Sequence, residues 1–200
     1  TSGWPSWAFS NHDVVRAASR WYNEPFEHDP RLSILLIALL GCLPGTIFVY
    51  QGEELGLPEA EIPFENIQDP WAKETWPQWQ GRDGCRTPIP WDDEQPFCGF
   101  STTEPWLPVA QSHYSLNYTD QLKEKHSTLA FTKRLLNWRA NKPEIIRGDF
   151  KFIDTSHSKI IHLVRFDNKN ETNCIFNISD KTINYNNQIL DAFSFKIDGF

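Results

Sequence analysis

Two short apolar runs stand out in the first fifty residues of the chain. Residues 6–9 begin with Ser6, are otherwise apolar and end two positions before the polar Asn11, and residues 46–50 are β-branched and aromatic without any alternation. Continuous apolar runs of this length are typical of strands that are buried on both faces, as in a parallel sheet. The pattern therefore predicts two buried parallel strands, with polar groups emerging at the carboxyl end of the first.

A helix is predicted between these two runs. Asp29 and Pro30 supply a capping acceptor followed by the residue best suited to the first helical position. Residues 32–40 are then apolar on nearly all sides, which indicates a helix packed on several faces, and Pro44-Gly45 ends it. Strand, helix and strand together form a β/α unit.

A long stretch without sustained periodicity follows, from residue 51 to residue 108. It far exceeds the roughly 12 to 15 residues beyond which a loop is usually functional or disordered. Its large aromatic residues argue against disorder, so we interpret it as a folded excursion over a site. Indole faces stack on sugar rings, although packing of the excursion against the rest of the protein is the other explanation for any single one. The tryptophans are Trp71, Trp76, Trp79, Trp91 and Trp106.

The pattern of apolar and polar residues changes in the last part of the chain. Residues 125–141 carry apolar positions at helical spacing, with Pro143 just beyond the end, which predicts a helix. After Gly148, short runs with partial alternation at 160–166 and 173–178 predict a small antiparallel β domain. We therefore expect an α/β part over residues 1–146 and an all-β domain over 147–200.

Charge and hydropathy narrow the classes of partner. The net charge is −7, from 19 basic and 26 acidic residues, and the acidic excess lies entirely before residue 147. This argues against a nucleic-acid partner, which requires clustered Lys and Arg, and fits a site lined with carboxylates as well as an ordinary acidic surface. The longest apolar run, Ile34 to Leu40, is far shorter than the roughly 20 residues needed to cross a bilayer. No membrane span is expected.

Cysteine usage and the first residues bear on the cellular compartment. Cys42, Cys85, Cys98 and Cys174 lack the spacing of a zinc or redox site and are expected to be buried thiols in a reducing compartment, with a Cys85–Cys98 bridge as the alternative. The start of the chain lacks the pattern of a secretory signal, and the chain contains no Met. We therefore expect a cytoplasmic protein in which Thr1 is an interior residue of a longer chain.

The first candidate site lies where the first predicted strand ends. Asn11, His12 and Asp13 stand there, where loops of parallel β/α folds converge on a pocket. A carboxylate such as Asp13 stabilises the positively charged state through which glycosidic bonds break, and the imidazole of His12 matches the donors and acceptors of sugar hydroxyls. A helix cap made by Asp13 is the alternative.

A second candidate lies in the excursion, at Gly81-Arg82-Asp83-Gly84. The guanidinium of Arg82 can grip a carboxylate in a bidentate fork and still donate to a hydroxyl, which suits the end of a sugar pocket. A purely structural pair of Arg82 with Asp83 is the alternative.

Three segments resemble glycoside hydrolase family 13, the α-amylase family. Residues 9–13 resemble the last of its signature regions, and residues 43–56 resemble the segment around its eighth barrel strand. Residues 81–91 resemble the loop typical of its α-glucosidase and oligo-1,6-glucosidase branch. The segments occur in the family's order and span the chain from about residue 7 to residue 106.

The resemblance implies the C-terminal part of a (β/α)8 barrel, with its last two β/α units and a long active-site loop at 51–108, followed by a small antiparallel β-sandwich domain. It implies that Asp13 is the transition-state-stabilising aspartate, that His12 binds substrate hydroxyls and that Arg82 closes the non-reducing end of the pocket. Arg16 matches an arginine of the same signature and is assigned a supporting role. Glu53 and Glu54 belong to the strand and its loop and not to bond cleavage.

The implied activity is that of a retaining, exo-acting α-glucosidase on short α-glucosides, with no metal or other cofactor. In the family the nucleophile and the acid/base carboxylate lie on earlier strands, so the 200-residue chain is expected to be inactive alone. A transglycosylase or isomerase of the sucrose or trehalose type would share every residue quoted. A non-catalytic transporter partner of the same family is a further alternative, although such proteins tend to lose site residues. The oligomeric state stays open.

Overall fold

The structure, a computed structural model, describes residues 3–22 and 29–200 and forms two compact units. One unit contains Thr1–Ala8, Pro30–Phe48 and Phe131–Phe200, and the other contains Phe9–Asp29 and Val49–Ala130. We call them the sheet unit and the loop unit. The domain boundary expected between residues 146 and 147 stays a prediction.

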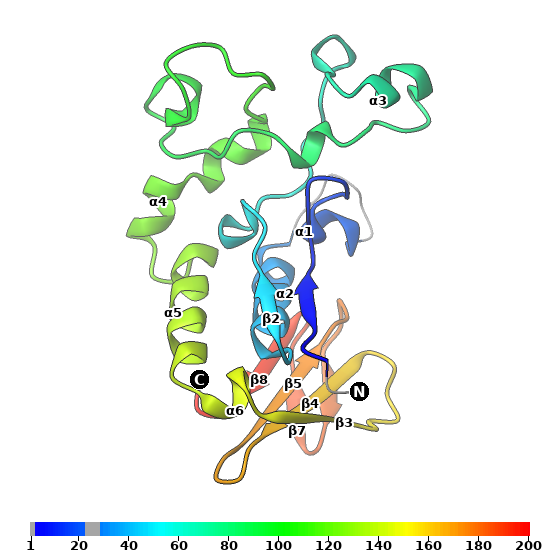
Figure 1. Cartoon of the computed structure of the whole chain (residues 1–200), viewed down its shortest axis with the longest axis vertical. Coiled ribbons are helices and arrows are strands. Elements are labelled where there is room, and N and C mark those ends of the chain that lie inside the picture. The colour runs from blue at the N-terminus through cyan, green and yellow to red at the C-terminus, as the bar shows by residue number, and fades with distance from the viewer. Residues whose placement is uncertain (1–2, 23–28) are drawn as a thin grey trace. The chain divides into compact units, whose positions relative to one another are not determined.

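The two predicted parallel strands are present but shorter than expected. In the sheet unit, β1 (Ser6–Ala8) pairs in parallel with β2 (Thr46–Phe48), and the two lie side by side (Figure 1). The prediction that both are fully buried is wrong for this structure, because β1 is exposed throughout and Phe48 is 57% exposed. Each strand pairs only with the other among the residues that the structure describes, which leaves both outer edges open.

The predicted helix between the strands is confirmed as α2 (Pro30–Cys42). Its apolar residues are buried on several faces, and it packs on strands of the C-terminal sheet. Two buried arginines bind the carbonyl groups at its C-terminal end: Arg139 donates to the carbonyls of Gly41 (2.6 Å) and Gly45 (2.8 Å), and Arg165 donates to that of Cys42 (2.7 Å). Burial lowers the pKa of both guanidinium groups. Their positive charge complements the negative end of the helix dipole.

The helix expected over 125–141 is α5 (Thr128–Ala140), and α6 (Pro143–Ile146) follows it. The expected antiparallel strands are also present, in a four-stranded sheet with the order β3-β4-β5-β8. A separate hairpin, β6-β7, packs through Leu190 against Ile160 and Ile175. The strands are β3 (Asp149–Ile153), β4 (Ile160–Phe166), β5 (Glu171–Asn177), β6 (Ile183–Tyr185), β7 (Gln188–Leu190) and β8 (Ser194–Ile197).

The loop unit contains short helical turns in place of long elements, as its lack of periodicity predicts. Its α-helices are α1 (Ala17–Arg20), α3 (Pro70–Thr75) and α4 (Tyr118–Lys123). Its 3-10 turns cover Glu53–Leu55, Phe64–Asn66, Asp83–Cys85, Pro96–Gly99 and Gln111–Leu116.

The five tryptophans between residues 51 and 108 differ in burial. Trp76 and Trp79 pack against a buried cluster that contains Ile62, Ile67 and Ala72. Trp71, Trp91 and Trp106 are 60%, 46% and 61% exposed. Packing in the buried cluster therefore accounts for two of them, whereas the other three are exposed, with Trp71 also against Trp79 and Trp91 against Tyr118.

Two further expectations concern the state of the cysteines and the absence of a membrane span. All four cysteines are free and buried, as expected, and Cys85 and Cys98 form no bridge, whereas the reducing compartment stays a prediction. No helix within residues 3–22 and 29–200 combines the length and the apolar character that crossing a membrane requires.

Candidate functional site

The segment after β1 is fixed by short-range hydrogen bonds in the loop unit. The backbone N–H of Ala17 donates to Ser10 Oγ (2.8 Å), and that of Asp13 donates to Asn11 Oδ1 (2.8 Å). Asp13 does not cap the helix that follows, because the N-cap position of α1 is Arg16, which makes no side-chain capping bond. The helix-cap alternative for Asp13 is therefore wrong, and its carboxylate is free to act elsewhere.

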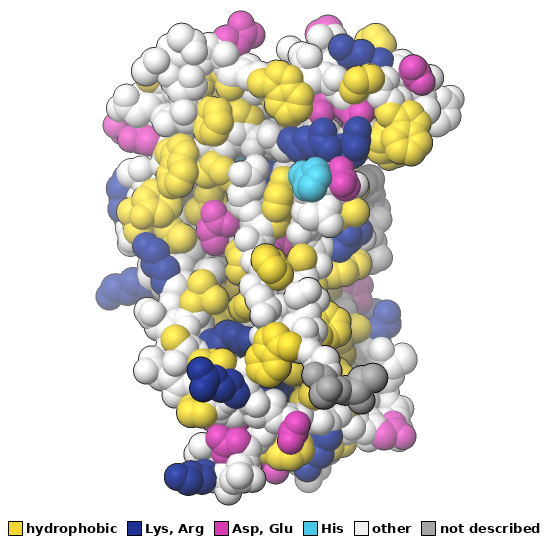
Figure 2. All heavy atoms as spheres, in the orientation of Figure 1, with side chains coloured by type: hydrophobic (Ala, Val, Ile, Leu, Met, Phe, Trp, Pro, Cys, Tyr) yellow, Lys and Arg dark blue, Asp and Glu magenta, His cyan; other side chains and the backbone are white. Residues whose placement is uncertain are grey.

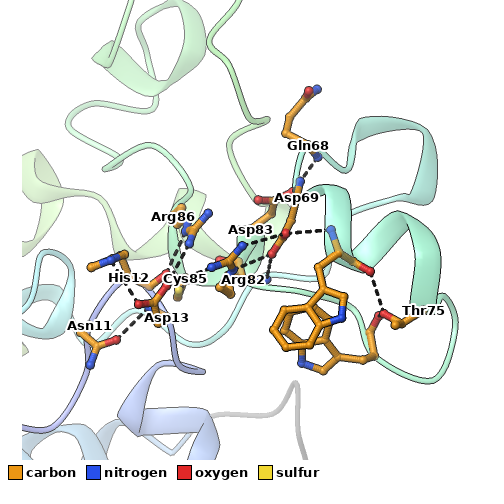
Figure 3. A network of polar contacts seen from close by, with 12 residues as sticks. Asn11, His12, Asp13, Gln68, Asp69, Thr75, Arg82, Asp83, Cys85 and Arg86 are labelled. Carbon is orange, nitrogen blue, oxygen red and sulfur yellow. Dashed lines mark hydrogen bonds and ion pairs between the residues drawn. The ribbon is translucent and has the colours of Figure 1, made fainter.

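The Asp13 carboxylate is the centre of a charged cluster (Figure 3). Its Oδ1 lies 3.3 Å from Arg82 Nη1 and 3.2 Å from Arg86 Nη2, and its Oδ2 lies 3.3 Å from His12 Nε2. Arg86 also donates through Nε to the backbone carbonyl of His12 (2.8 Å). The side chains of His12 and Asp13 are 70% and 52% exposed, so the cluster is open to a ligand. Figure 2 shows basic, acidic and histidine side chains gathered together on one face.

Arg82 is held in place by a second carboxylate, that of Asp69. Its Nε donates to Asp69 Oδ2 (2.7 Å) and its Nη2 to Asp69 Oδ1 (3.0 Å), which is the bidentate fork that the residue type allows. Hydrogen bonding from Arg82 lowers the pKa of Asp69 to about 2, and Asp69 in turn raises the pKa of Arg82. Arg82 therefore keeps only Nη1 for Asp13.

The structural pair of Arg82 with Asp83 that the sequence left open is wrong. Asp83 is fully buried, and its Oδ2 accepts hydrogen bonds from the backbone N–H groups of Gln68 (2.6 Å) and Asp69 (2.8 Å). It thereby joins the segment that carries Asp69 to the turn that carries Arg82. Gly84, next in the chain, lies against the Ala60 carbonyl, and a Cβ added to it would be only 2.4 Å from that oxygen.

Arg16 is buried within the loop unit and is 1% exposed. Its Nη1 donates to the Gln51 carbonyl (2.6 Å), and its guanidinium carbon is 5.6 Å from the centre of the Tyr50 ring. Its Nε and Nη2 make no hydrogen bond to the described part of the chain. Burial lowers the pKa of Arg16 even though Glu59 is nearby. These contacts support the backbone around the site, and the role assigned to Arg16 stays a prediction.

Glu53 and Glu54 bind backbone groups of the turn after β2. Glu53 Oε2 accepts from the N–H of Tyr50 (2.9 Å), and Glu54 Oε2 accepts from that of Gly52 (2.8 Å). Neither carboxylate contacts Asp13 among the described residues. Burial raises the pKa of Glu53.

Glu59 is a buried carboxyl group that links two parts of the site. Its Oε2 accepts the backbone N–H of Arg16 (2.8 Å), and its own N–H donates to Ser19 Oγ (2.8 Å). Burial raises its pKa to about 7, and the nearby Arg16 only partly offsets this. The folded protein therefore holds the Glu59 proton more tightly than the unfolded chain does.

The raised pKa of Glu59 predicts how the free energy of unfolding changes with pH. Because the folded pKa of Glu59 lies above the unfolded value of 4.5, the free energy of unfolding falls as pH rises from about 4.5 to about 7, by about 3 kcal/mol. We expect Glu59→Gln to remove most of this fall, measured as urea midpoints across that range. The exposed Glu61→Gln is the control and should behave as the wild type. Equal pH dependence in Glu59→Gln and wild type would contradict the assignment. Asp69 titrates at lower pH, outside this range.

The structure brings together His12, Asp13 and Arg82 in one cluster, as the sequence predicted they would lie. It adds Arg86 and Asp69, which sequence reasoning missed. Arg86 falls within the quoted segment 81–91, four residues after Arg82, and this spacing across one turn was an available signal. For Asp69, no pattern in the sequence indicated its pairing. No group of three or more His, Cys, Asp or Glu residues in the described ranges could hold a metal ion.

Comparison of the sequence with known proteins identifies the family of the chain. The model of the α-amylase catalytic domain matches residues 1–148. A probable α-glucosidase of Rhizobium meliloti (strain 1021) is 43% identical over 179 residues, which cover 90% of this chain and 32% of the relative. An oligo-1,6-glucosidase of Bacillus cereus is 29% identical and is matched over 82% of this chain and 32% of the relative. The chain thus spans about a third of the length of these relatives.

Solved structures agree on the fold. An α-glucosyl transfer enzyme, XgtA, is 42% identical with a TM-score of 0.86, over 92% of this chain and 34% of that enzyme. The trehalulose synthase MutB of Pseudomonas mesoacidophila MX-45 shares the fold at 22% identity and a TM-score of 0.80, over 92% of this chain and 36% of that enzyme. With a family match over most of its length and a close relative over nine tenths of it, this chain belongs to the α-amylase family, glycoside hydrolase family 13, as a part of its catalytic domain and the sheet that follows.

Proposed function

We propose that this chain is part of a retaining, exo-acting α-glucosidase that releases glucose from the non-reducing end of short α-glucosides. The observation that carries the proposal is the half-exposed Asp13 carboxylate, held between Arg82 and Arg86 and beside His12. A carboxylate in such a setting is both fixed in position and accessible. The similarity to α-glucosidases supports the substrate class.

The chemistry follows from the geometry. Cleavage of a glycosidic bond passes through a state with positive charge on the sugar ring, and a fixed carboxylate near the ring lowers its energy. Asp13 would supply this charge and accept hydrogen bonds from sugar hydroxyls. His12 would offer its exposed imidazole to the same hydroxyls, and Arg82 would donate to the hydroxyls at the end of the pocket.

The remaining catalytic groups are proposed to lie outside residues 1–200. The parallel pair β1 and β2 would form the last two strands of a (β/α)8 barrel, and the C-terminal sheet with its hairpin would form the sandwich domain. The nucleophile and the acid/base carboxylate would lie on other strands, so the 200-residue chain alone should not hydrolyse α-glucosides. The four unpaired thiols support a reducing compartment, and we propose the cytoplasm.

Glucosyl transfer is the second candidate reaction. The observation that favours it is the 42% identity to an enzyme whose structure is described as that of an α-glucosyl transfer enzyme. Hydrolysis and transfer use the same first step and differ in whether water or a sugar hydroxyl accepts the glucosyl group. Product analysis of the full-length protein on maltose and on sucrose separates the two, because transfer yields oligosaccharides or isomers in addition to free glucose.

Arg82 gives a direct test of substrate recognition. In the full-length protein we expect Arg82→Ala to raise KM for maltose by about tenfold to a hundredfold, because one charged donor to the terminal sugar is lost. The exposed Lys73→Ala, in the neighbouring α3, is the control. Thermal unfolding of each variant reports any loss of fold from the unpaired Asp69. Unchanged kinetics on maltose in a folded Arg82→Ala protein would refute the role.

A further inference from the structure

A polar pocket lies in the loop unit, and it is separate from the Asp13 cluster. Its volume is about 250 Å³, and its lining includes Asn66, Gln68, Glu104, Trp106 and Tyr114. None of the residues that contact Asp13 lines it. In Figure 3 the side chain of Gln68 points away from Asp13 and Arg82. The pocket is therefore not part of the cluster described above.

The polar groups of this pocket are available to a ligand. Within residues 3–22 and 29–200 no hydrogen bond uses the side-chain amide of Asn66, the carboxylate of Glu104 or the indole N–H of Trp106. Gln68 makes only a long bond, from its amide to the Asn66 carbonyl at 3.4 Å. Together these side chains offer neutral donors, neutral acceptors and one anionic acceptor.

An aromatic wall faces the same space. Trp106 is 61% exposed, and Phe97 adds a second ring. Phe97 and Cys98 adopt left-handed backbone conformations, with φ of 48° and 55°, which cost a residue with a side chain about 1–2 kcal/mol each. The turn is held by hydrogen bonds from the N–H groups of Trp91 (2.8 Å) and Asp92 (3.0 Å) to the Cys98 carbonyl. The ring of Phe97 is thus placed at the pocket by a constrained turn.

The chemistry of the lining selects the class of ligand. No Lys, Arg or His lines the pocket, so nothing there would attract a phosphate or a carboxylate. A single carboxylate is too few for a metal ion. An apolar ligand would leave the amides of Asn66 and Gln68 unpaired on burial, which is costly. A neutral ring with hydroxyls on its edge and C–H groups on its face satisfies both the amides and the indole.

We propose that this pocket is an auxiliary saccharide site that binds one glucose ring of an α-glucoside. The volume is below the roughly 300–1,000 Å³ of pockets for drug-sized ligands and suits a single ring. The choice of glucose rests on the proposed function, whereas binding of a pyranose ring does not. Gln68 of the pocket directly precedes Asp69 of the cluster, and the Asp83 carboxylate binds the N–H groups of both.

The test uses the full-length protein labelled with 5-fluorotryptophan. Fluorine NMR signals are assigned with Trp106→Phe and Trp4→Phe, and D-glucose, maltose and sorbitol are titrated in turn. We expect the Trp106 signal to shift and saturate with glucose and with maltose. The Trp4 signal, from a side chain exposed to a similar extent (59%) but in the sheet unit and outside the pocket, should not shift. Sorbitol, an acyclic polyol without a ring face, should leave both signals in place.

A second variant ties the shift to the pocket. Asn66→Ala should weaken the glucose response of Trp106 about tenfold, or about 1.4 kcal/mol, while kcat and KM for p-nitrophenyl α-glucoside stay at wild-type values. An unmoved Trp106 signal, an equal response to sorbitol or an unchanged affinity in Asn66→Ala would overturn the proposal. If the proposed function is wrong, the full-length protein would not hydrolyse α-glucosides, yet the Trp106 signal could still shift with glucose. The two hypotheses can therefore fail independently, and the measurements distinguish the two cases.

Discussion

Replacing Asp13 by Asn is expected to lower kcat of the full-length enzyme on maltose by about 10²–10³-fold while leaving the fold intact. The change keeps the size of the side chain and one acceptor oxygen for Arg82 and Arg86, removes the negative charge, and replaces the second oxygen, which faces His12, with an NH2 donor. That charge is what stabilises the cationic sugar in the transition state. Because the effect acts on the chemical step, kcat should fall far more than KM changes.

The exposed Asp93→Asn is the matched control, since it removes one charge from the same loop unit outside the cluster. Thermal unfolding curves of both variants should overlay that of the wild type within a few degrees. A folded Asp13→Asn protein with near-normal turnover would remove Asp13 from the catalytic residues and with it the basis of the proposed function.

Gly84→Ala is expected to have the largest effect on stability among the substitutions considered. A Cβ at this position would lie 2.4 Å from the Ala60 carbonyl oxygen and 2.4 Å from Glu59 Oε1. The Ala60 carbonyl belongs to the backbone, and the N–H of Ala60 donates to the Gly84 carbonyl (3.3 Å). The segments that carry Ala60 and Gly84 therefore cannot move apart without losing this hydrogen bond. We expect a loss of about 2 kcal/mol, or about 4–8 °C in Tm for a chain of this size.

The same substitution should also weaken substrate binding, because the turn Asp83–Cys85 lies between Arg82 and Arg86. Gly3→Ala is the control, since no atom lies within 4 Å of a Cβ built there. Calorimetry of the 200-residue chain measures Tm, and maltose kinetics of the full-length protein measure KM. A wild-type Tm in Gly84→Ala would show that the turn yields more easily than its contacts indicate.

The sequence predicted the elements that depend on local pattern. The helix at α2 and the strands β4 and β5 follow directly from apolar runs and their flanking residues, and so they were found within a few positions. The convergence of His12, Asp13 and Arg82 was predicted only through the resemblance to the α-amylase family, because Asp13 and Arg82 are 69 positions apart in the chain. Local pattern alone could not have joined them.

Other features could not be predicted, because they depend on tertiary contacts. Arg82 has an acidic neighbour in sequence, Asp83, yet it pairs with Asp69, since Asp83 turns inward to bind backbone N–H groups. Exposure of β1 and β2 was missed for a related reason. An apolar run indicates what a strand prefers to bury, whereas the area it does bury depends on which other strands and helices contact it.

The two arginines at the end of α2 determine how the sheet unit loses structure. Arg165, on β4, binds the carbonyl of a residue 123 positions earlier, so the helix and the sheet share their hydrogen bonds. Opening of the sheet would leave that carbonyl without its donor, and fraying of the helix would take from a buried cation the shortest of its hydrogen bonds. Amide protons of α2 and of β4 should therefore exchange with solvent in one common opening event. Deletion of the C-terminal strands would accordingly destabilise a helix that begins at residue 30.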